Sequence, residues 1–235
     1  MRVIVDKLAK TYGFLWALRD LHLDLPAGEC VALLGPNGAG KTSLLKLLAG
    51  LVAPSAGAIR FDGVELSRSL PALRARVGLL APADHLYENL TARENLVFFS
   101  RLYHRDATAP VLGAALAQVG LDGRAGDYVA NLSSGMKCRL SIAKWLLLQP
   151  ELLLLDEPYG VLDGHGVDLL ETFLKEQCAK GSIVIMASHH VSRALSLCNR
   201  AVILSRGRLT FDEAKQESWA SFHNAFSDFL PRGTL

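Results

Sequence analysis

The stretch that decides the fold reads Gly35-Pro36-Asn37-Gly38-Ala39-Gly40-Lys41-Thr42. It fits the phosphate-loop pattern G-x-x-x-x-G-K-[ST] at every fixed position. Its glycines let successive backbone N–H groups turn inward around an anion. The apolar run of residues 30–34 before the loop predicts a buried strand, and the periodicity of residues 42–51 after it predicts a helix. This order of strand, loop and helix favours a nucleotide-binding loop over an ordinary glycine turn.

The loop and the first turn of the helix are expected to bind the phosphates of ATP together with Mg²⁺. Lys41 would neutralise the β- and γ-phosphates, and the hydroxyl of Thr42 would ligate the metal ion. The helix that begins near Lys41 adds the positive end of its dipole. The residues expected to contact the nucleotide here are Gly35, Pro36, Asn37, Gly38, Ala39, Gly40, Lys41, Thr42 and Ser43.

A pair of acids, Asp156 and Glu157, follows the apolar run of residues 152–155. A buried strand in this position would deliver Asp156 to the metal ion, while Glu157 would point at the γ-phosphate and polarise the attacking water. The alternative is a strand that ends in two solvated acids. The phosphate loop upstream favours the catalytic interpretation, with Lys41 and Glu157 as catalytic residues.

The remaining patterns predict an α/β fold with an antiparallel sub-domain at its N-terminus and a helical insert. Strands are expected near residues 3–5 and 21–25, then at 58–61, 152–155, 183–187, 201–204 and 208–211. Helices are expected over 167–178 and over most of 90–149, with breaks near Pro110, Gly120 and Gly126. We expect one domain over residues 1–235, with a helical sub-domain at about 85–150.

Length and composition limit the classes of protein to which this chain can belong. Its 235 residues suffice for one large domain, and half of them are hydrophobic, which argues against disorder. The formal net charge of +2 does not indicate nucleic-acid binding, so no nucleic-acid partner is expected. The four cysteines form no C-x-x-C pair, which is typical of reduced thiols inside a cell rather than of disulfides or a zinc site.

No segment of the sequence is expected to span a membrane. Charges such as Arg2 and Asp6 interrupt every early apolar stretch, so no signal peptide is expected. The most apolar region, residues 140–155, is broken by Lys144 and Glu151 and falls short of the roughly 20 apolar residues that a spanning helix needs. We therefore expect a soluble, cytoplasmic chain whose membrane role is at most peripheral.

The run Leu132-Ser133-Ser134-Gly135-Met136 precedes the acid pair, and with it the chain resembles the ABC ATPase family, whose usual form is L-S-G-G-Q. The motifs occur in the family's order, and the resemblance covers about residues 3–209. It implies a P-loop NTPase fold with a RecA-like core, an N-terminal antiparallel β sub-domain and a helical sub-domain. It also implies ATP hydrolysis that is coupled to transport.

The resemblance implies roles for residues outside these motifs. Tyr12 would stack on adenine, and Asp163 would belong to the loop that follows the second acid strand. His189 would be the switch histidine, a catalytic residue that contacts the γ-phosphate. A plain aromatic at a strand end and a polar strand cap are the alternatives for Tyr12 and His189. Ser133 and Gly135 would contact the nucleotide that an opposite subunit's phosphate loop holds.

The partners that the resemblance implies are a second ATPase subunit, in a homodimer, and an integral membrane permease. In this family two ATP molecules are buried between two head-to-tail protomers. Binding drives closure, and hydrolysis with phosphate loss releases it, so that the permease is moved in each cycle. The chain would then be a conformational motor, cytoplasmic and peripheral to the cell membrane.

Three positions depart from the family's usual residues. Pro82 stands where a glutamine normally reaches Mg²⁺ and the attacking water, and proline supplies no side-chain donor or acceptor. Basal hydrolysis is therefore expected to be slower than in a glutamine-bearing relative, unless Asp84 or His85 substitutes. Ser134 and Met136 replace glycine and glutamine of the signature, but the serine and glycine that touch phosphate remain.

The run LYENLTARENL at residues 86–96 looks like that of the ATPases of drug, polysaccharide and haem exporters. Within that group the chain is most like the haem-exporter ATPase of cytochrome c maturation, a subgroup that often lacks the glutamine. One alternative is the motor of a multidrug, lipid or polysaccharide exporter. The other is a soluble ABC ATPase that acts as an assembly factor. No residue of the sequence identifies the cargo.

Overall fold

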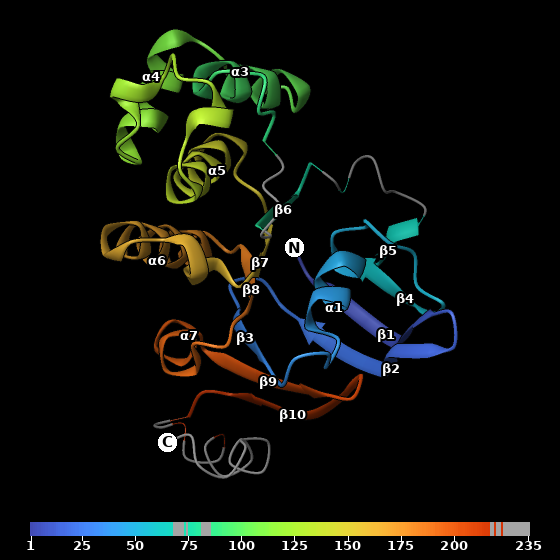
Figure 1. Cartoon of the computed structure of the whole chain (residues 1–235). Coiled ribbons are helices and arrows are strands. Elements are labelled where there is room, and N and C mark those ends of the chain that lie inside the picture. The colour runs from blue at the N-terminus through green and yellow to red at the C-terminus, as the bar shows by residue number, and fades with distance from the viewer. Residues whose placement is uncertain (68–72, 74, 81–85, 217–218, 220–221, 223–235) are drawn as a thin grey trace.

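The computed structural model describes residues 1–67, 73, 75–80, 86–216, 219 and 222 of the chain. Over these residues the chain forms a 4-stranded sheet and a 6-stranded sheet (Figure 1). Helix α1 (Lys41–Leu48) contacts strands of both sheets, and α6 (Gly164–Ala179) and α7 (Val191–Leu197) pack on the opposite face of the larger one. The expected α/β fold is confirmed.

The smaller sheet is built from the N-terminal segments in which apolar residues alternate with polar ones. Its order is β2-β1-β4-β5, and each neighbouring pair is antiparallel. The strands are β1 (Val3–Tyr12), β2 (Leu15–Leu25), β4 (Ala56–Phe61) and β5 (Val64–Glu65). Val3 and Val5 are buried and their neighbours are less so, as the alternation predicts for a sheet with one covered face.

The larger sheet has the order β10-β9-β3-β8-β7-β6. Its strands are β3 (Cys30–Leu34), β6 (Val77–Leu80), β7 (Leu152–Asp156), β8 (Ile183–Ala187), β9 (Arg200–Ser205) and β10 (Arg208–Ala214). All neighbours are parallel except β10, which returns antiparallel to β9. The predicted strands after residue 150 are confirmed, and the expected hairpin at 201–211 extends to Ala214.

Alternate residues of the larger sheet face two separate hydrophobic cores. On β3, Val31 and Leu33 belong to the core that holds α1 and the antiparallel sheet. Ala32 and Leu34 belong to the core on the other face, which holds the remaining helices. Every residue of β3 is buried, which explains why the strand reads as an unbroken apolar run. The loop that leaves the end of β3 therefore starts from a firmly packed strand.

Between β6 and β7 the chain forms a group of helices that lies at the top of Figure 1. These elements are α3 (Ala92–Leu102), α4 (Ala109–Gln118), η1 (Asp122–Arg124), η2 (Val129–Asn131) and α5 (Ser134–Leu148). Helix α3 begins at a capping box, in which Thr91 and Glu94 each accept a hydrogen bond from the other's backbone N–H. Within the described residues, no helix is both long and apolar enough to cross a membrane.

One helix boundary differs from the sequence prediction, and one predicted break is present. Helix α1 ends at Leu48 instead of continuing to residue 51, because Gly50 takes a φ of 66° just beyond its end. The break expected near Pro110 is confirmed, since α3 ends at Leu102 and α4 begins at Ala109. Pro110 lies in the first turn of α4, where a missing N–H leaves no intrahelical bond unmade, and the interruption precedes it.

The fold brings together cysteines that lie far apart in the sequence. All four are free thiols, and Cys30, Cys138 and Cys198 are buried. The Sγ atom of Cys30 donates to that of Cys198 at 3.3 Å, across the contact between the start of β3 and the end of α7. The pKa of Cys178 is raised well above its usual range, mainly by a hydrogen bond with Cys30 and to a smaller extent by burial. The Cys178 thiol is therefore held in its protonated form.

Candidate functional site

The phosphate loop connects the end of β3 to α1, and its shape depends on two glycines. Gly35 has a φ of 140°, and a Cβ there would collide with the carbonyl oxygen of Leu204 on β9. Gly40 has a φ of 109°, and its Cβ would lie 2.5 Å from the carbonyl oxygen of Ala17. Both the backbone conformation and the close approach of neighbouring strands exclude any other residue at these positions.

A cleft of about 270 Å³ opens over this loop. Most of the residues expected to bind phosphate share it. Its lining consists of Ala17, Asn37, Gly38, Ala39, Gly40, Lys41, Thr42, Ser43, Asp156 and Glu157. The first turn of α1 contains no acidic residue of its own, and its N–H groups present the positive end of the helix dipole to the cleft. The cleft is therefore suited to an anion.

The ammonium group of Lys41 lies across the loop. Its Nζ donates to the carbonyl oxygens of Gly35 at 2.7 Å and of Pro36 at 3.2 Å. Partial burial lowers the pKa of Lys41, and the charges of Glu157 and Asp156 oppose that shift. A partly desolvated ammonium gains stabilisation from any anion that replaces neutral carbonyls as its partner.

The donor set beside Lys41 fits a magnesium ion. The hydroxyl of Thr42 donates to Oδ2 of Asp156 at 2.7 Å, which joins the first turn of α1 to the end of β7. Asp156 is only 9 % exposed, yet its carboxylate reaches the cleft. Hydroxyl and carboxylate oxygens are the ligands that Mg²⁺ prefers, usually together with substrate phosphates. The pair could therefore hold the ion between the two strand–helix units.

Glu157 occupies a strained position at the edge of the cleft. Its φ of 52° and ψ of 53° place it in the left-handed region, which costs an L residue roughly 1–2 kcal/mol. Its N–H donates to the carbonyl of Ala187, which anchors the strained residue to the end of β8. Strain of this kind gathers at functional sites, where the surrounding structure maintains it.

His189 is brought onto Glu157 from the end of β8. Oε2 of Glu157 lies 2.7 Å from Nδ1 of His189 and also accepts the backbone N–H of His189 at 3.0 Å. A carboxylate with an imidazole bound to it can polarise a water molecule and take up its proton. The structure thus joins the second acid to the histidine that the family resemblance singled out.

Four other expected nucleotide-binding residues lie apart from this cleft. Tyr12 ends β1, is 48 % exposed and carries Lys10 over its ring at 5.1 Å. Ser133 caps the N-terminus of α5 by accepting the N–H of Met136, and Gly135 lies in the first turn of that helix. Asp163 caps α6 by accepting the N–H of Gly166.

The substituted glutamine position cannot be placed by this structure. Pro82, together with Asp84 and His85, lies outside the described residues. The expected effect of Pro82 on hydrolysis therefore stays a prediction.

Ala17 is a residue of the cleft that the sequence did not reveal. The pairing of β1 with β2 shifts register between Lys10 and Thr11, so that Ala17 forms a β-bulge between Trp16 and Leu18. The bulge turns the Ala17 carbonyl toward Gly40 and Gly207. The alternation of apolar residues along β2 carries no sign of this irregularity.

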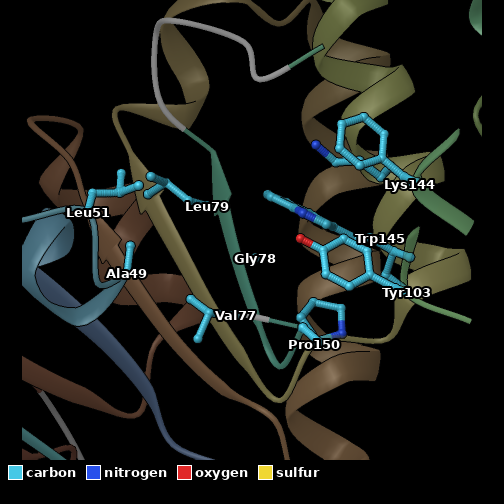
Figure 2. A pocket seen from close by; sticks show the side chains of 12 residues that line it. Ala49, Leu51, Val77, Gly78, Leu79, Tyr103, Lys144, Trp145 and Pro150 are labelled. Carbon is cyan, nitrogen blue, oxygen red and sulfur yellow. The ribbon is translucent and has the colours of Figure 1, made fainter. Parts of the chain in front are cut away.

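A second hollow, of about 210 Å³, lies between the edge strand β6 and the helical group (Figure 2). One wall carries Leu51, Val77 and Leu79, and the other carries Tyr103 and Trp145. A Cβ on Gly78 would lie 2.9 Å from Nε1 of Trp145, so a glycine is needed where β6 passes the indole. We refer to this hollow as the β6 groove. Its lining comes from separate segments of the chain, which is why no local pattern indicated it.

Comparison with known proteins places these features among ATP-binding proteins. The family model described as ABC transporter matches residues 18–160. A protein of Paraburkholderia xenovorans (strain LB400) named Nod factor export ATP-binding protein I is 37 % identical over 205 residues, which cover 86 % of this chain and 67 % of that protein. Its namesake from Rhizobium johnstonii is 37 % identical over 86 % of this chain and 65 % of its own length. The chain thus spans about two thirds of the length of these relatives.

Solved structures are similar over nearly the whole chain. The structure titled as the ATP binding subunit of an ABC transporter aligns with a TM-score of 0.88 at 28 % identity, and the alignment covers 97 % of this chain and 99 % of that one. A dimeric cassette, MJ0796 bound to ADP and Pi, aligns with a TM-score of 0.82 at 24 % identity over 91 % of this chain and 99 % of its own. The second likeness concerns the fold alone.

Proposed function

Since the chain belongs to the ABC transporter family, we propose that it is the ATP-hydrolysing subunit of an exporter and that it acts on a separate membrane permease. The observation that carries this proposal is the Glu157–His189 pair at the edge of a cleft built on the phosphate loop. A strained carboxylate held by an imidazole beside an anion cradle is suited to activating water against a terminal phosphate.

Each cleft residue then has a role in hydrolysis. Lys41 exchanges its carbonyl partners for β- and γ-phosphate oxygens, and the N–H groups from Gly38 to Ser43 bind the phosphates. Thr42 and Asp156 hold Mg²⁺, which when bound offsets charge on the phosphate oxygens. Glu157 accepts the proton of the attacking water, and His189 keeps that carboxylate oriented. Tyr12 extends from the neighbouring sheet to stack on the base.

A second copy of the chain is part of the proposal. Ser133 and Gly135 begin α5 in the helical group, apart from the cleft that contains Lys41. They can contribute to hydrolysis only by meeting a nucleotide that another subunit holds. A head-to-tail dimer provides this contact at two equivalent sites, with Asp163 near the junction.

The β6 groove supports the existence of a permease partner. It is an apolar hollow beside the edge strand, with Leu51 about half exposed at its rim. A helix of the permease could fill it and follow the movement of the helical group against the sheets. The chain would then be peripheral, on the cytoplasmic side of the membrane.

Export is the direction that the relatives' names support. They are named for Nod factor export, and this chain is more than a third identical to them. Haem export for cytochrome c maturation is not the activity that these names give, and it stays a prediction that rests on residues 86–96 and Pro82. Multidrug, lipid or polysaccharide export is equally compatible with the motor described above.

The proposal is tested by trapping the ATP-bound state with Glu157→Gln. We expect hydrolysis to fall about a hundredfold or more while ATP binding persists, since the substitution removes the proton acceptor but leaves the phosphate cradle. The trapped protein, affinity-purified from gently solubilised native membranes, should carry a multispanning protein in equal amount. Mass spectrometry of that partner identifies the class of exporter.

The matched control is Glu176→Gln, which makes the same chemical change at an exposed position of α6. It should hydrolyse ATP at the wild-type rate. Full activity in Glu157→Gln would remove the assigned mechanism. A trapped protein that binds ATP but recovers no membrane protein would leave a soluble ABC ATPase, acting as an assembly factor, as the better interpretation.

A further inference from the structure

Behind His189 lies a row of aromatic rings that the proposed hydrolysis has not used. The ring of His190 lies 4.0 Å from the ring of His189, centroid to centroid, at an interplanar angle of 39°. The ring of Tyr159 meets His190 edge-on, at 6.1 Å and 84°. The row therefore runs from the histidine on Glu157 to η3 (Pro158–Val161), the turn that follows the acid pair.

The far end of this row is anchored by two helices. Tyr159 is only 7 % exposed. The guanidinium of Arg193, on α7, covers its ring at 5.4 Å, and the Tyr159 hydroxyl donates to Glu171, on α6, at 3.5 Å. Arg193 also pairs with Glu171 at 3.8 Å. Tyr159 is therefore fixed by a cation above the ring, an acid at the hydroxyl and burial in the core.

The near end of the row is His189, whose side-chain orientation depends on its neighbours. The side chain of His189 is 65 % exposed, so the protein core does not fix its orientation. The contacts that orient it are the hydrogen bond between Nδ1 and Glu157 and the tilted ring contact with His190. Without the second contact the imidazole is free to take other rotamers, and the hydrogen bond to Glu157 is made for a smaller fraction of the time.

We propose that His190 and Tyr159 are positioning residues for hydrolysis, which transmit the fixed orientation of η3 and α7 to the His189 ring and thereby to Glu157. The inference rests on the proposed ATPase function. Neither residue touches the cleft of the phosphate loop, and both act through His189. Movement of α6 or α7 would then change hydrolysis without any change in the phosphate contacts.

The test compares His190→Ala with His190→Phe. Loss of the ring is expected to lower kcat for ATP about fivefold, in line with the strength of one aromatic contact, while KM for ATP changes little. His190→Phe keeps an aromatic ring at the same position and should restore most of kcat. Tyr159→Leu should resemble His190→Ala, and Tyr159→Phe should be milder. Ser192→Ala, in the same exposed turn of α7, is the matched control and should behave as wild type.

A second readout does not depend on hydrolysis. Side-chain ¹H–¹⁵N correlation spectra of the histidines should give one dominant tautomer for His189 in the wild type, with Nδ1 protonated toward Glu157. That signature should be lost in His190→Ala and retained in His190→Phe. The proposal is overturned by an unchanged kcat and tautomer in His190→Ala, or by equal losses in the Ala and Phe variants. A wild type with the tautomer signature but without ATPase activity would refute the proposed function and, with it, the role in hydrolysis, although His190 would still be shown to orient His189.

Discussion

At the scale of single residues, the cleft depends on two backbone positions that only glycine tolerates and on one left-handed position that carries a side chain. Gly35 and Gly40 are required by close neighbours as well as by positive φ, whereas Glu157 takes a positive φ although it has a side chain. The sequence motif indicated the glycines directly, because the spacing is that of a phosphate loop. The left-handed conformation of Glu157 was not predictable, because it is imposed by the end of β8 through Ala187.

Two alanine substitutions in the loop separate the cost of a positive φ from the cost of a close neighbour. Gly40→Ala should lower the free energy of unfolding by about 2 kcal/mol or more, because strain adds to a collision with the Ala17 carbonyl. Gly38→Ala has open space around its Cβ and a φ of 76°, so only backbone strain of about 1 kcal/mol is expected. Thermal and urea unfolding of the two variants measure the difference. Equal losses would mean that the Ala17 approach is unimportant.

At the scale of elements, most strands and helices followed from local patterns, but β6 and α7 were not predicted, and neither was the mutual placement of the elements. Unbroken apolar runs gave β3, β7 and β8, since strands buried on both faces need no polar alternation. The β-bulge at Ala17 and the β6 groove arise where distant segments meet, so no window of sequence contains them. The family resemblance placed Glu157 and His189 each at the γ-phosphate but did not predict their direct contact, which follows from the parallel pairing of β7 with β8.

An ion-pair network at the start of β6 and β7 carries a prediction about these elements. Arg76 donates to both oxygens of Glu151, at 2.7 and 2.8 Å, and to Asp62 in the β4–β5 turn at 2.7 Å. It thereby joins the edge strand β6 both to β7 and to the antiparallel sheet. The hydrogen bond from Arg76 is the main cause that lowers the pKa of Glu151 below 4.5 and that of Asp62 below 3.8.

Arg76→Met should destabilise the protein by about 1 kcal/mol at neutral pH, since the groups are partly exposed and screened. Acids with a depressed pKa stabilise the folded state above their unfolded pKa, and this contribution is lost as pH falls through the folded value. The stability difference between wild type and Arg76→Met should therefore shrink as pH falls below about 4.5. Urea unfolding from pH 7 to pH 3 measures it, with the exposed Arg208→Met as the control. A difference that is constant with pH would assign the loss to the arginine's alkyl chain.

At the scale of the whole molecule, the cleft and the β6 groove lie at different places on the larger sheet, the cleft at the ends of interior strands and the groove beside the edge strand. The cleft uses the C-terminal ends of β3 and β7, while the groove uses the outer side of β6 and the helical group. In the proposed function, nucleotide chemistry and permease binding therefore use separate residues. This separation gives a way to disturb one without the other.

Leu51→Glu tests that separation. The substitution places a charge at the rim of the β6 groove, where a docked permease helix would have to desolvate it. Recovery of the permease should fall by about tenfold or more, while basal ATP hydrolysis stays at the wild-type level. Val64→Glu, at a comparably exposed apolar position on β5, should leave both unchanged. Normal permease recovery with Leu51→Glu would mean that the partner binds elsewhere.

The strand order has a consequence for how the chain is made. Among the described residues, the strand that leads into the phosphate loop pairs with β8 and β9, which follow it by well over a hundred positions: Cys30 lies opposite Val184, and Val31 lies opposite Arg200. A growing polypeptide therefore cannot complete the nucleotide cleft until β8 and β9 have left the ribosome. Until then β3 is an apolar segment without its partners, and such segments are the ones that aggregate or engage chaperones. Nucleotide can thus stabilise this protein only after β8 and β9 have been synthesised, and earlier protection must come from the antiparallel sheet and α1.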